Sequence, residues 1–270
     1  MGLFDIFKKT EAPKQSESAK IAEKEVNTTS STDTVSKGYL GDLQKTQAIA
    51  SLLSVAHEER NEQWAAALLS DMPLASFRCG TPQIIAGPDG FPYFQLFLPE
   101  EGKEFQCFVI DKMVNDFLLN RGYGVVLDPG TGQPDWVLTY GDILNYHLNG
   151  SFFKPEHFFS TSKEAEEVVI EGEEIMVGQP SETILPVQTR ILLKDFFQLN
   201  GIDEPKVMLM MRKKGEEVSQ DLVFNITPDG FESEEQYRNM MQTVTWYLPR
   251  HYSVVGLNDN NQADNGFMPL

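Results

Sequence analysis

Residues 174–257 alternate between extended and helical patterns in an order that few folds accommodate. Four apolar stretches predict strands: EIMVG (174–178), KVMLMMRKK (206–214), VSQDLVFNI (218–226) and YSVVGL (252–257). Between them, residues 186–201 have helical periodicity, and Ser233 with Gln236 forms a capping box that begins a second helix ending before Pro249. The order strand, helix, strand, strand, helix, strand predicts a ferredoxin-like (βαββαβ) half with a split βαβ plan.

The preceding part of the chain predicts another α+β half of less regular order. Apolar periodicity predicts helical segments over 41–70, 111–122 and 142–150. Five stretches predict strands: QIIAG (83–87), YFQLFLP (93–99), EFQCFVI (104–110), GVVLD (124–128) and DWVLTY (135–140). A glutamate-rich run over 154–174 is typical of a solvated boundary. We therefore predict an α+β fold of two α/β-sandwich halves, an N-terminal domain over 38–160 and a C-terminal domain over 161–270.

A polar segment precedes this folded body. Residues 10–37 contain almost no large apolar side chains and are rich in Ser, Thr, Lys and Glu. Such a segment cannot bury enough apolar surface to offset its ordering entropy, so we expect residues 1–37 to comprise a short amphipathic start and a disordered linker. Basic and acidic side chains are equal in number there, so the whole formal net charge of −18 falls on residues 38–270. The folded body is therefore the acidic part of the protein.

The first nine residues, MGLFDIFKK, have an apolar face if they form a helix. Leu3, Phe4, Ile6 and Phe7 fall within an arc of about 160°, with a carboxylate and two lysines opposite. Such a face on a flexible tether predicts docking to a partner groove or weak contact with a membrane surface. A frayed turn, or a turn packed on the body, is the alternative, because nine residues are marginal for a helix in water.

Charge and cysteine content restrict the functional classes. An acidic body disfavours nucleic acid, whose phosphates need a basic face, and favours a partner protein with a basic surface. Two cysteines are too few for a disulfide scaffold, and no stretch approaches the roughly 20 apolar residues of a membrane span. We expect a cytoplasmic protein, with peripheral membrane contact through residues 1–9 as the alternative.

Short catalytic and cofactor motifs are missing from the sequence. It contains no GxxxxGK[ST], GxGxxG, GxSxG, HExxH or CxxC. None of the four histidines lies three to five residues from another histidine or a cysteine, so no local metal site is encoded. We predict no cofactor, no metal and no catalytic residues. Cys79 and Cys107 are interpreted as structural thiols, with Cys79 the more exposed.

The densest group of functional residue types lies in DPGTGQPDWVLTYGDIL (128–144). Three carboxylates and two aromatic rings make up the candidate binding residues: Asp128, Asp135, Trp136, Tyr140 and Asp142. Loop carboxylates beside aromatic rings are typical of a recognition surface and also of an acid–base pair. Each carboxylate also has an ordinary structural interpretation, in a turn, at a strand start or at a helix cap.

Two parts of the sequence are informative: GYGVVLDPGTGQPDWVLTYGDIL (122–144), and IMVGQP (175–180), which is followed by a helix and KVMLMMRKK. Both resemble the SseB family, named for enhanced serine sensitivity. The closing FMPL (267–270) is also similar to the short C-terminal ends of that family. The resemblance covers roughly residues 42–270. It implies a two-part bacterial α+β protein and carries no catalytic residues over to this chain.

Three functional hypotheses remain open at this point. The leading one is a non-enzymatic protein-binding or regulatory module that acts through its acidic body. The second is a sensor that binds an amino-acid-like metabolite in the C-terminal half. The third is an enzyme without short motifs, using Asp128, Asp135 or Cys79.

Overall fold

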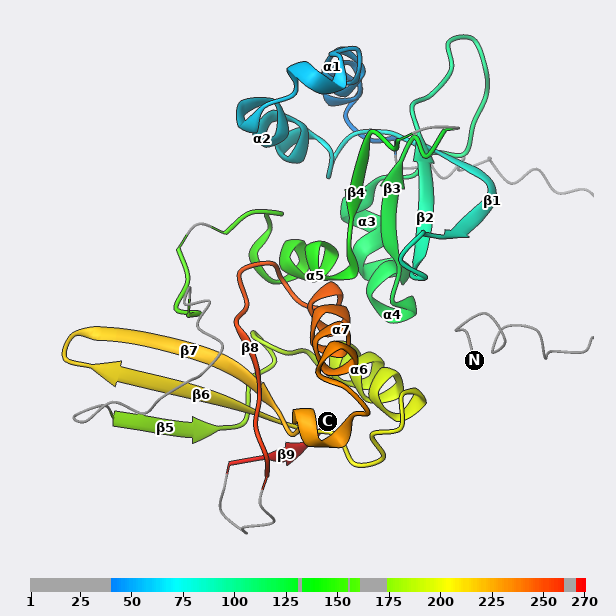
Figure 1. Cartoon of the computed structure of the whole chain (residues 1–270). Helices are drawn as coiled ribbons and strands as arrows, with labels where there is room; N and C mark the ends of the chain where they lie inside the picture. The colour runs from blue at the N-terminus through cyan, green and yellow to red at the C-terminus, as the bar shows by residue number, and fades with distance from the viewer. Residues whose placement is uncertain (1–39, 131–132, 155, 161–173, 260–265) are drawn as a thin grey trace, which may run out of the picture. The chain divides into compact units, whose positions relative to one another are not determined.

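A computed structural model of the chain describes residues 40–130, 133–154, 156–160, 174–259 and 266–270 (Figure 1). Leu40–Leu270 form one compact unit of mixed helices and strands, so the predicted α+β class is confirmed. The expected disordered linker and the predicted docking residues Leu3, Phe4, Ile6 and Phe7 lie outside the described residues. In the described part of the chain, no helix is long and apolar enough to cross a membrane.

Two helices form the start of the compact unit. α1 (Leu43–Leu53) begins at Asp42, whose carboxylate accepts hydrogen bonds from two backbone N–H groups. α2 (Glu62–Asp71) begins at Asn61, whose side-chain oxygen accepts one from the Trp64 backbone N–H. A 3₁₀ turn, η2 (His57–Glu59), separates them. The helical periodicity predicted over 41–70 is therefore real but interrupted.

The first sheet contains four strands in the order β1-β2-β3-β4. Their bounds are β1 (Arg78–Ala86), β2 (Pro92–Phe97), β3 (Gly124–Leu127) and β4 (Trp136–Leu138). β1 and β2 form an antiparallel hairpin, β2 and β3 pair in parallel, and β3 and β4 pair antiparallel. All four residues of β3 are buried, as expected for a strand with both faces covered.

A broken helix connects the parallel strands β2 and β3. It consists of α3 (Ile110–Met113), a π-helical turn η3 (Val114–Leu118) and α4 (Leu119–Arg121). Gly122 ends it in the left-handed conformation, with φ of 69°. The strand predicted at EFQCFVI (104–110) is wrong: only Phe108 bridges to Phe77, and Ile110 already begins α3. β2, the strand before it, already pairs with β1 and β3 along its two edges, so residues 104–110 cannot form a hairpin with β2.

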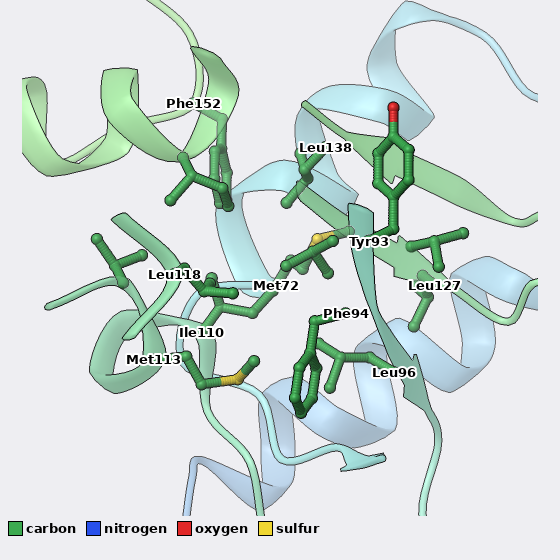
Figure 2. Packing of buried hydrophobic residues seen from close by; sticks show 14 of the residues in the cluster. Met72, Tyr93, Phe94, Leu96, Ile110, Met113, Leu118, Leu127, Leu138 and Phe152 are labelled. Carbon is green, nitrogen blue, oxygen red and sulfur yellow. The ribbon is translucent and has the colours of Figure 1, made fainter. Parts of the chain in front are cut away.

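The core of the first sheet gathers side chains from every element around it. Figure 2 shows its centre, where Met72, the residue after α2, packs with Phe94 and Leu96 of β2 and Leu118 of η3. Fully buried apolar side chains of this size each contribute about 1.5–3 kcal/mol of stability. The same cluster includes residues of α5 (Tyr140–Asn149), which follows β4.

The second sheet has the order β5-β6-β7-β8, with a short strand β9 paired to β6. Its strands are β5 (Glu174–Gly178), β6 (Lys206–Lys214), β7 (Glu217–Phe224), β8 (Val254–Gly256) and β9 (Met268–Pro269). α6 (Val187–Leu199) and α7 (Glu234–Trp246) pack on one face through a core whose members include Leu193, Phe197, Met240 and Val244. Each sheet falls on one side of the boundary predicted near residue 160.

The element order predicted for the second half is confirmed, but its split βαβ pairing is not observed. A split plan needs another strand between the two strands that flank a helix. In the structure α7 connects β7 and β8, which pair directly in parallel, and α6 connects β5 and β6, which pair directly as antiparallel neighbours. Strand order depends on contacts between distant residues, which apolar periodicity does not encode.

One residue of α7 also belongs to the core of the first sheet. The Trp246 ring stacks on Phe91, with 3.9 Å between ring centroids, and its Nε1 donates a hydrogen bond to the Tyr93 hydroxyl at 2.8 Å. Burial and a hydrogen bond to Asp89 raise the pKa of Tyr93 well above its usual value. Trp246 therefore connects α7 to the β1–β2 hairpin.

Candidate functional site

The five candidate binding residues do not form one cluster. Asp128 is exposed at the end of β3, with a positive φ of 42°. Tyr140 is fully buried, and its hydroxyl lies 3.0 Å from the Thr189 Oγ1 of α6; burial raises its pKa to about 12. Only Asp135 and Trp136 lie together, half-buried at the start of β4.

Asp142 is a structural residue at the start of α5. Its carboxylate accepts hydrogen bonds from the backbone N–H and the hydroxyl of Thr139, which completes a capping box. Both of its oxygens also accept from Arg250, at 2.7 and 2.8 Å. The helix was expected to begin with Asp142 as its N-cap, but Thr139 is the N-cap and Asp142 lies three residues inside.

Asp135 and Trp136 border an open pocket of about 600 Å³. Its walls come from three places in the chain: the segment from η2 into α2, the loop before β4, and the residue after Pro249. The lining residues are His57, Arg60, Asn61, Glu62, Trp64, Ala65, Gln133, Pro134, Asp135, Trp136, Val137 and Arg250. We call this the tryptophan pocket.

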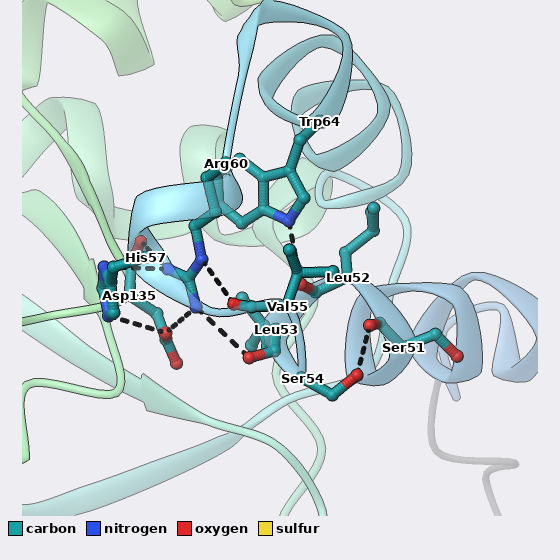
Figure 3. Close-up of polar contacts among 9 residues, drawn as sticks. All are labelled: Ser51, Leu52, Leu53, Ser54, Val55, His57, Arg60, Trp64 and Asp135. Atoms are coloured by element: carbon teal, nitrogen blue, oxygen red, sulfur yellow. Dashed lines mark hydrogen bonds and ion pairs between the residues drawn. The ribbon is translucent and has the colours of Figure 1, made fainter.

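Arg60 holds one side of the tryptophan pocket in place (Figure 3). Its guanidinium donates to the backbone carbonyls of Leu53, Val55 and Asp135 at 3.0–3.2 Å, and to the Asp135 carboxylate at 2.8 Å. The Arg60 side chain is only 8% exposed. A planar guanidinium suits this set of acceptors because its donors point in fixed, divergent directions. Arg60 and Asp135 therefore join the α1–α2 connection to β4.

The floor of the pocket is aromatic. The rings of Trp64 and Trp136 are 5.7 Å apart between centroids and tilted by 52°. Trp64 donates from Nε1 to the Leu52 carbonyl at 2.8 Å, and the Arg60 guanidinium lies 4.6 Å from its ring centroid. The Trp136 Nε1 is buried and has no hydrogen-bond partner among the described residues. Trp64 is buried and Trp136 only half-buried, so Trp136 is the ring more accessible to a ligand.

The rim of the pocket carries exposed charges of both signs. Glu62 of α2 lines the pocket and is exposed, and Glu58 and Glu59 of η2, which are exposed, adjoin its lining residues His57 and Arg60 in the chain. Arg250 stands opposite with 67% of its side chain exposed; its hydrogen bonds to Asp142 raise its pKa. Arg250 is paired with a buried carboxylate, whereas Glu58, Glu59 and Glu62 have no ion-pair partner among the described residues, so the unpaired charge near the pocket is acidic.

Three residues of the tryptophan pocket were not singled out from the sequence. Arg60 and Trp64 contact Asp135 and Trp136, more than 70 positions away at the start of β4. Arg250 lies more than 100 positions from Asp142. Trp64 has the spacing of an ordinary core position on a helix, and it is indeed buried. No local pattern distinguishes these residues from structural ones.

The remaining candidates for chemistry lie apart from this pocket. Cys79 and Cys107 are both free thiols and half-buried. Across the described ranges, no group of three or more His, Cys, Asp or Glu side chains has an arrangement that could hold a metal ion. His147 is exposed on α5.

Comparison with known proteins adds no further evidence on the site. No family model matches the chain, and we found neither a similar curated protein nor a similar solved structure. The resemblance to the SseB family therefore rests only on the sequence stretches 122–144, 175–180, 206–214 and 267–270.

Proposed function

We propose that the protein is a non-enzymatic binding module of the SseB type that acts in the cytoplasm and receives a basic segment of a partner protein in the tryptophan pocket. The observation that carries this proposal is the combination of an aromatic floor, Trp64 and Trp136, with exposed carboxylates on the rim. An acidic body with a net charge of −18 attracts a basic partner at long range.

The chemistry of the pocket suits a lysine or arginine side chain. A cation placed over a tryptophan face gains about 0.5–2 kcal/mol from the ring quadrupole. Arg60 already makes such a contact with Trp64, at 4.6 Å, while Trp136 has no cation over it among the described residues. Glu58, Glu59 and Glu62 supply the complementary charge around this ring.

The ion pairs of the pocket favour binding over catalysis. A general base needs a carboxylate or imidazole that is free to exchange a proton with a substrate. The Asp135 carboxylate instead accepts from Arg60 at 2.8 Å, and its Oδ1 lies 3.8 Å from the His57 Nε2. Asp142 is likewise occupied by Arg250 and its own helix start.

Charge reversal of the rim tests the proposal. We would express the full chain at native level with Glu58, Glu59 and Glu62 changed to lysine, and capture its partners. The matched control reverses Glu216 and Glu217, two exposed carboxylates at the tip of the β6–β7 hairpin. We expect a stoichiometric protein to be recovered with the wild type and the control and lost with the rim variant. Equal recovery with all three proteins would contradict the role of the pocket.

A complementary experiment defines the chemistry of the partner. Binding of the full chain to an array of peptides that differ in lysine and arginine content should rise with basic charge and fall with added salt. Trp136→Leu should weaken the binding of basic peptides about fivefold or more, because it removes the ring but keeps apolar volume. A preference for neutral or acidic peptides would overturn the proposal.

Peripheral membrane contact through residues 1–9 is a separate part of the proposal. It predicts that the full chain sediments with anionic vesicles and that deletion of residues 1–9 abolishes the sedimentation. Because residues 10–37 are polar and carry four basic against five acidic side chains, their presence alone should not restore it.

A further inference from the structure

A second pocket lies away from the tryptophan pocket. It has a volume of about 530 Å³ and is bounded by the segment after α5, the turn before α6, β7 and the residues that follow Pro249. Its lining residues include Lys154, Glu156, His157, Phe158, His251 and Tyr252. We call this the histidine pocket.

Two histidines from distant parts of the chain meet in it. The rings of His157 and His251 are 4.9 Å apart between centroids. The Nδ1 atom of His157 is buried and has no hydrogen-bond partner among the described residues. A buried polar atom without a partner costs roughly 1–3 kcal/mol, so a ligand that supplies the missing hydrogen bond would recover part of that cost.

The rest of the pocket is aromatic and carries one charge of each sign. Tyr252 stacks on Phe159 with 3.9 Å between centroids, and its hydroxyl donates to the Ile184 carbonyl at 2.8 Å, so its polar atom is occupied. Phe158 is 67% exposed. Lys154 donates to the Asn149 side chain at 2.9 Å and Glu156 is exposed; the contributions from the α6 turn and β7, which include Thr183 and Gln220, are uncharged.

We propose that the histidine pocket binds a small organic carboxylate, with its anionic end at His157, His251 and Lys154 and its apolar part against Phe158 and Tyr252. An imidazole nitrogen without a partner and an ammonium group both suit a carboxylate oxygen. Glu156 at the same rim disfavours a doubly charged phosphate more than a singly charged carboxylate. The apolar rings favour a ligand with an aryl or alkyl group over free acetate.

Binding should be coupled to proton uptake. Burial, together with the neighbouring His157 and Lys154, lowers the pKa of His251 to about 4, so the His251 ring is neutral in the empty pocket at pH 7. A bound carboxylate offsets the positive charge and raises the pKa of the rings it contacts. Where one proton is taken up, the affinity rises by up to about tenfold for each pH unit of acidification.

The test titrates the full chain with three probes of similar shape: benzoate, phenyl phosphate and neutral benzamide. Calorimetry at pH 6 and pH 8 should show benzoate binding with the higher affinity at pH 6, weaker binding of phenyl phosphate and no binding of benzamide. His157→Gln and His251→Gln should each weaken benzoate about tenfold, while the control His147→Gln on the exposed face of α5 should not change it.

The outcomes separate this proposal from its alternatives. Absence of benzoate binding up to about 10 mM, or binding that the two histidine variants leave unchanged, overturns it. Phenyl phosphate bound more tightly than benzoate overturns the choice of carboxylate. If a histidine variant unfolds, Lys154→Gln replaces it, because this side chain is exposed and should weaken benzoate about threefold without affecting the fold. None of these results bears on the rim variants of the tryptophan pocket, so the two proposals fail separately.

Discussion

The two pockets differ in how their basic side chains are satisfied, although each also holds one buried nitrogen, Trp136 Nε1 or His157 Nδ1, without a partner among the described residues. In the tryptophan pocket, Arg60 and Asp135 donate to or accept from each other and from the backbone, and Arg250 is held by Asp142. In the histidine pocket, the Nδ1 atom of His157 has no partner among the described residues, and the adjacent His251 ring is held in its neutral form. The pockets have similar volumes, about 600 and 530 Å³.

This difference separates the structural use of polar residues from their use in recognition. In the first pocket Arg60 and Arg250 are already paired with carboxylates inside the fold, so a ligand meets mainly the half-buried Trp136 ring and the exposed glutamates. Where a nitrogen is left without a partner, a ligand can complete the hydrogen bonding itself. Substitutions in each pocket, followed by unfolding and binding measurements, can test whether the two pockets differ in this way.

The largest effect is expected at Arg60. Arg60→Met removes the donors to three backbone carbonyls and leaves the Asp135 carboxylate, 17% exposed, without its cation. Breaking a largely buried pair in this way costs about 3–5 kcal/mol of unfolding free energy, measured by urea denaturation. Lys45→Met is the control, since the Lys45–Asp71 pair is more than a quarter exposed on both sides and should cost less than about 1 kcal/mol. Equal losses would show that Arg60 is not a structural residue.

A smaller effect is expected at Asp142. Asp142→Ala removes the reciprocal hydrogen bonds of the capping box and the partner of Arg250, with an expected loss of about 2 kcal/mol. Thr139→Ala removes only the hydroxyl side of the same box and should cost about 1 kcal/mol. A loss for Asp142→Ala no larger than that for Thr139→Ala would show that the Arg250 pair contributes nothing.

The histidine pocket predicts a pH dependence. Because the folded-state pKa of His251 is about 4, below the ordinary 6.5, the unfolded chain binds this proton first as the pH falls. Stability should therefore decrease between pH 6.5 and about 4 and be unaffected by His251 above pH 6.5. After allowance for partial exposure the loss is about 1–2 kcal/mol. Urea unfolding at several pH values checks this against His251→Gln, which should flatten the difference; parallel curves would contradict it.

The smallest effect on stability is expected at the rim of the tryptophan pocket. Reversal of Glu58, Glu59 or Glu62 should change the unfolding free energy by less than about 0.5 kcal/mol each, because these side chains are exposed. Their effect should appear only in partner binding. A large loss of stability would mean that the rim belongs to the fold and would weaken the interpretation of the capture experiment.

Local patterns predicted most elements but not how they pair. The helix ends at Gly122 and Gly150, the β1–β2 turn at Pro88–Gly90 and the Ser233 cap all follow from the chemistry of single residues. The failed strand at 104–110 has the right alternation, yet β2 has no open edge to receive it. Alternation along a segment does not specify which strand it pairs with, and this also explains why the split βαβ plan was predicted but is not observed.

The candidate sites were predictable only in part. Asp135 and Trp136 stand out as a carboxylate beside an aromatic ring, and the structure places them at a pocket. Their partners Arg60 and Trp64 come from a distant helix start, and the pairing of His157 with His251 joins segments almost 100 residues apart. Tyr140 has the same residue chemistry as a recognition ring, but burial against α6 gives it a structural role.

The position of Trp246 has a consequence for synthesis on the ribosome. Trp246, which contacts the Tyr93 hydroxyl and the Phe91 ring, is translated 153 residues after Tyr93. Until then the first sheet lacks one member of its core and exposes an aromatic surface to other nascent chains. The core of the first half is thus completed only after most of the second half has been synthesised. Folding of the whole unit therefore depends on α7.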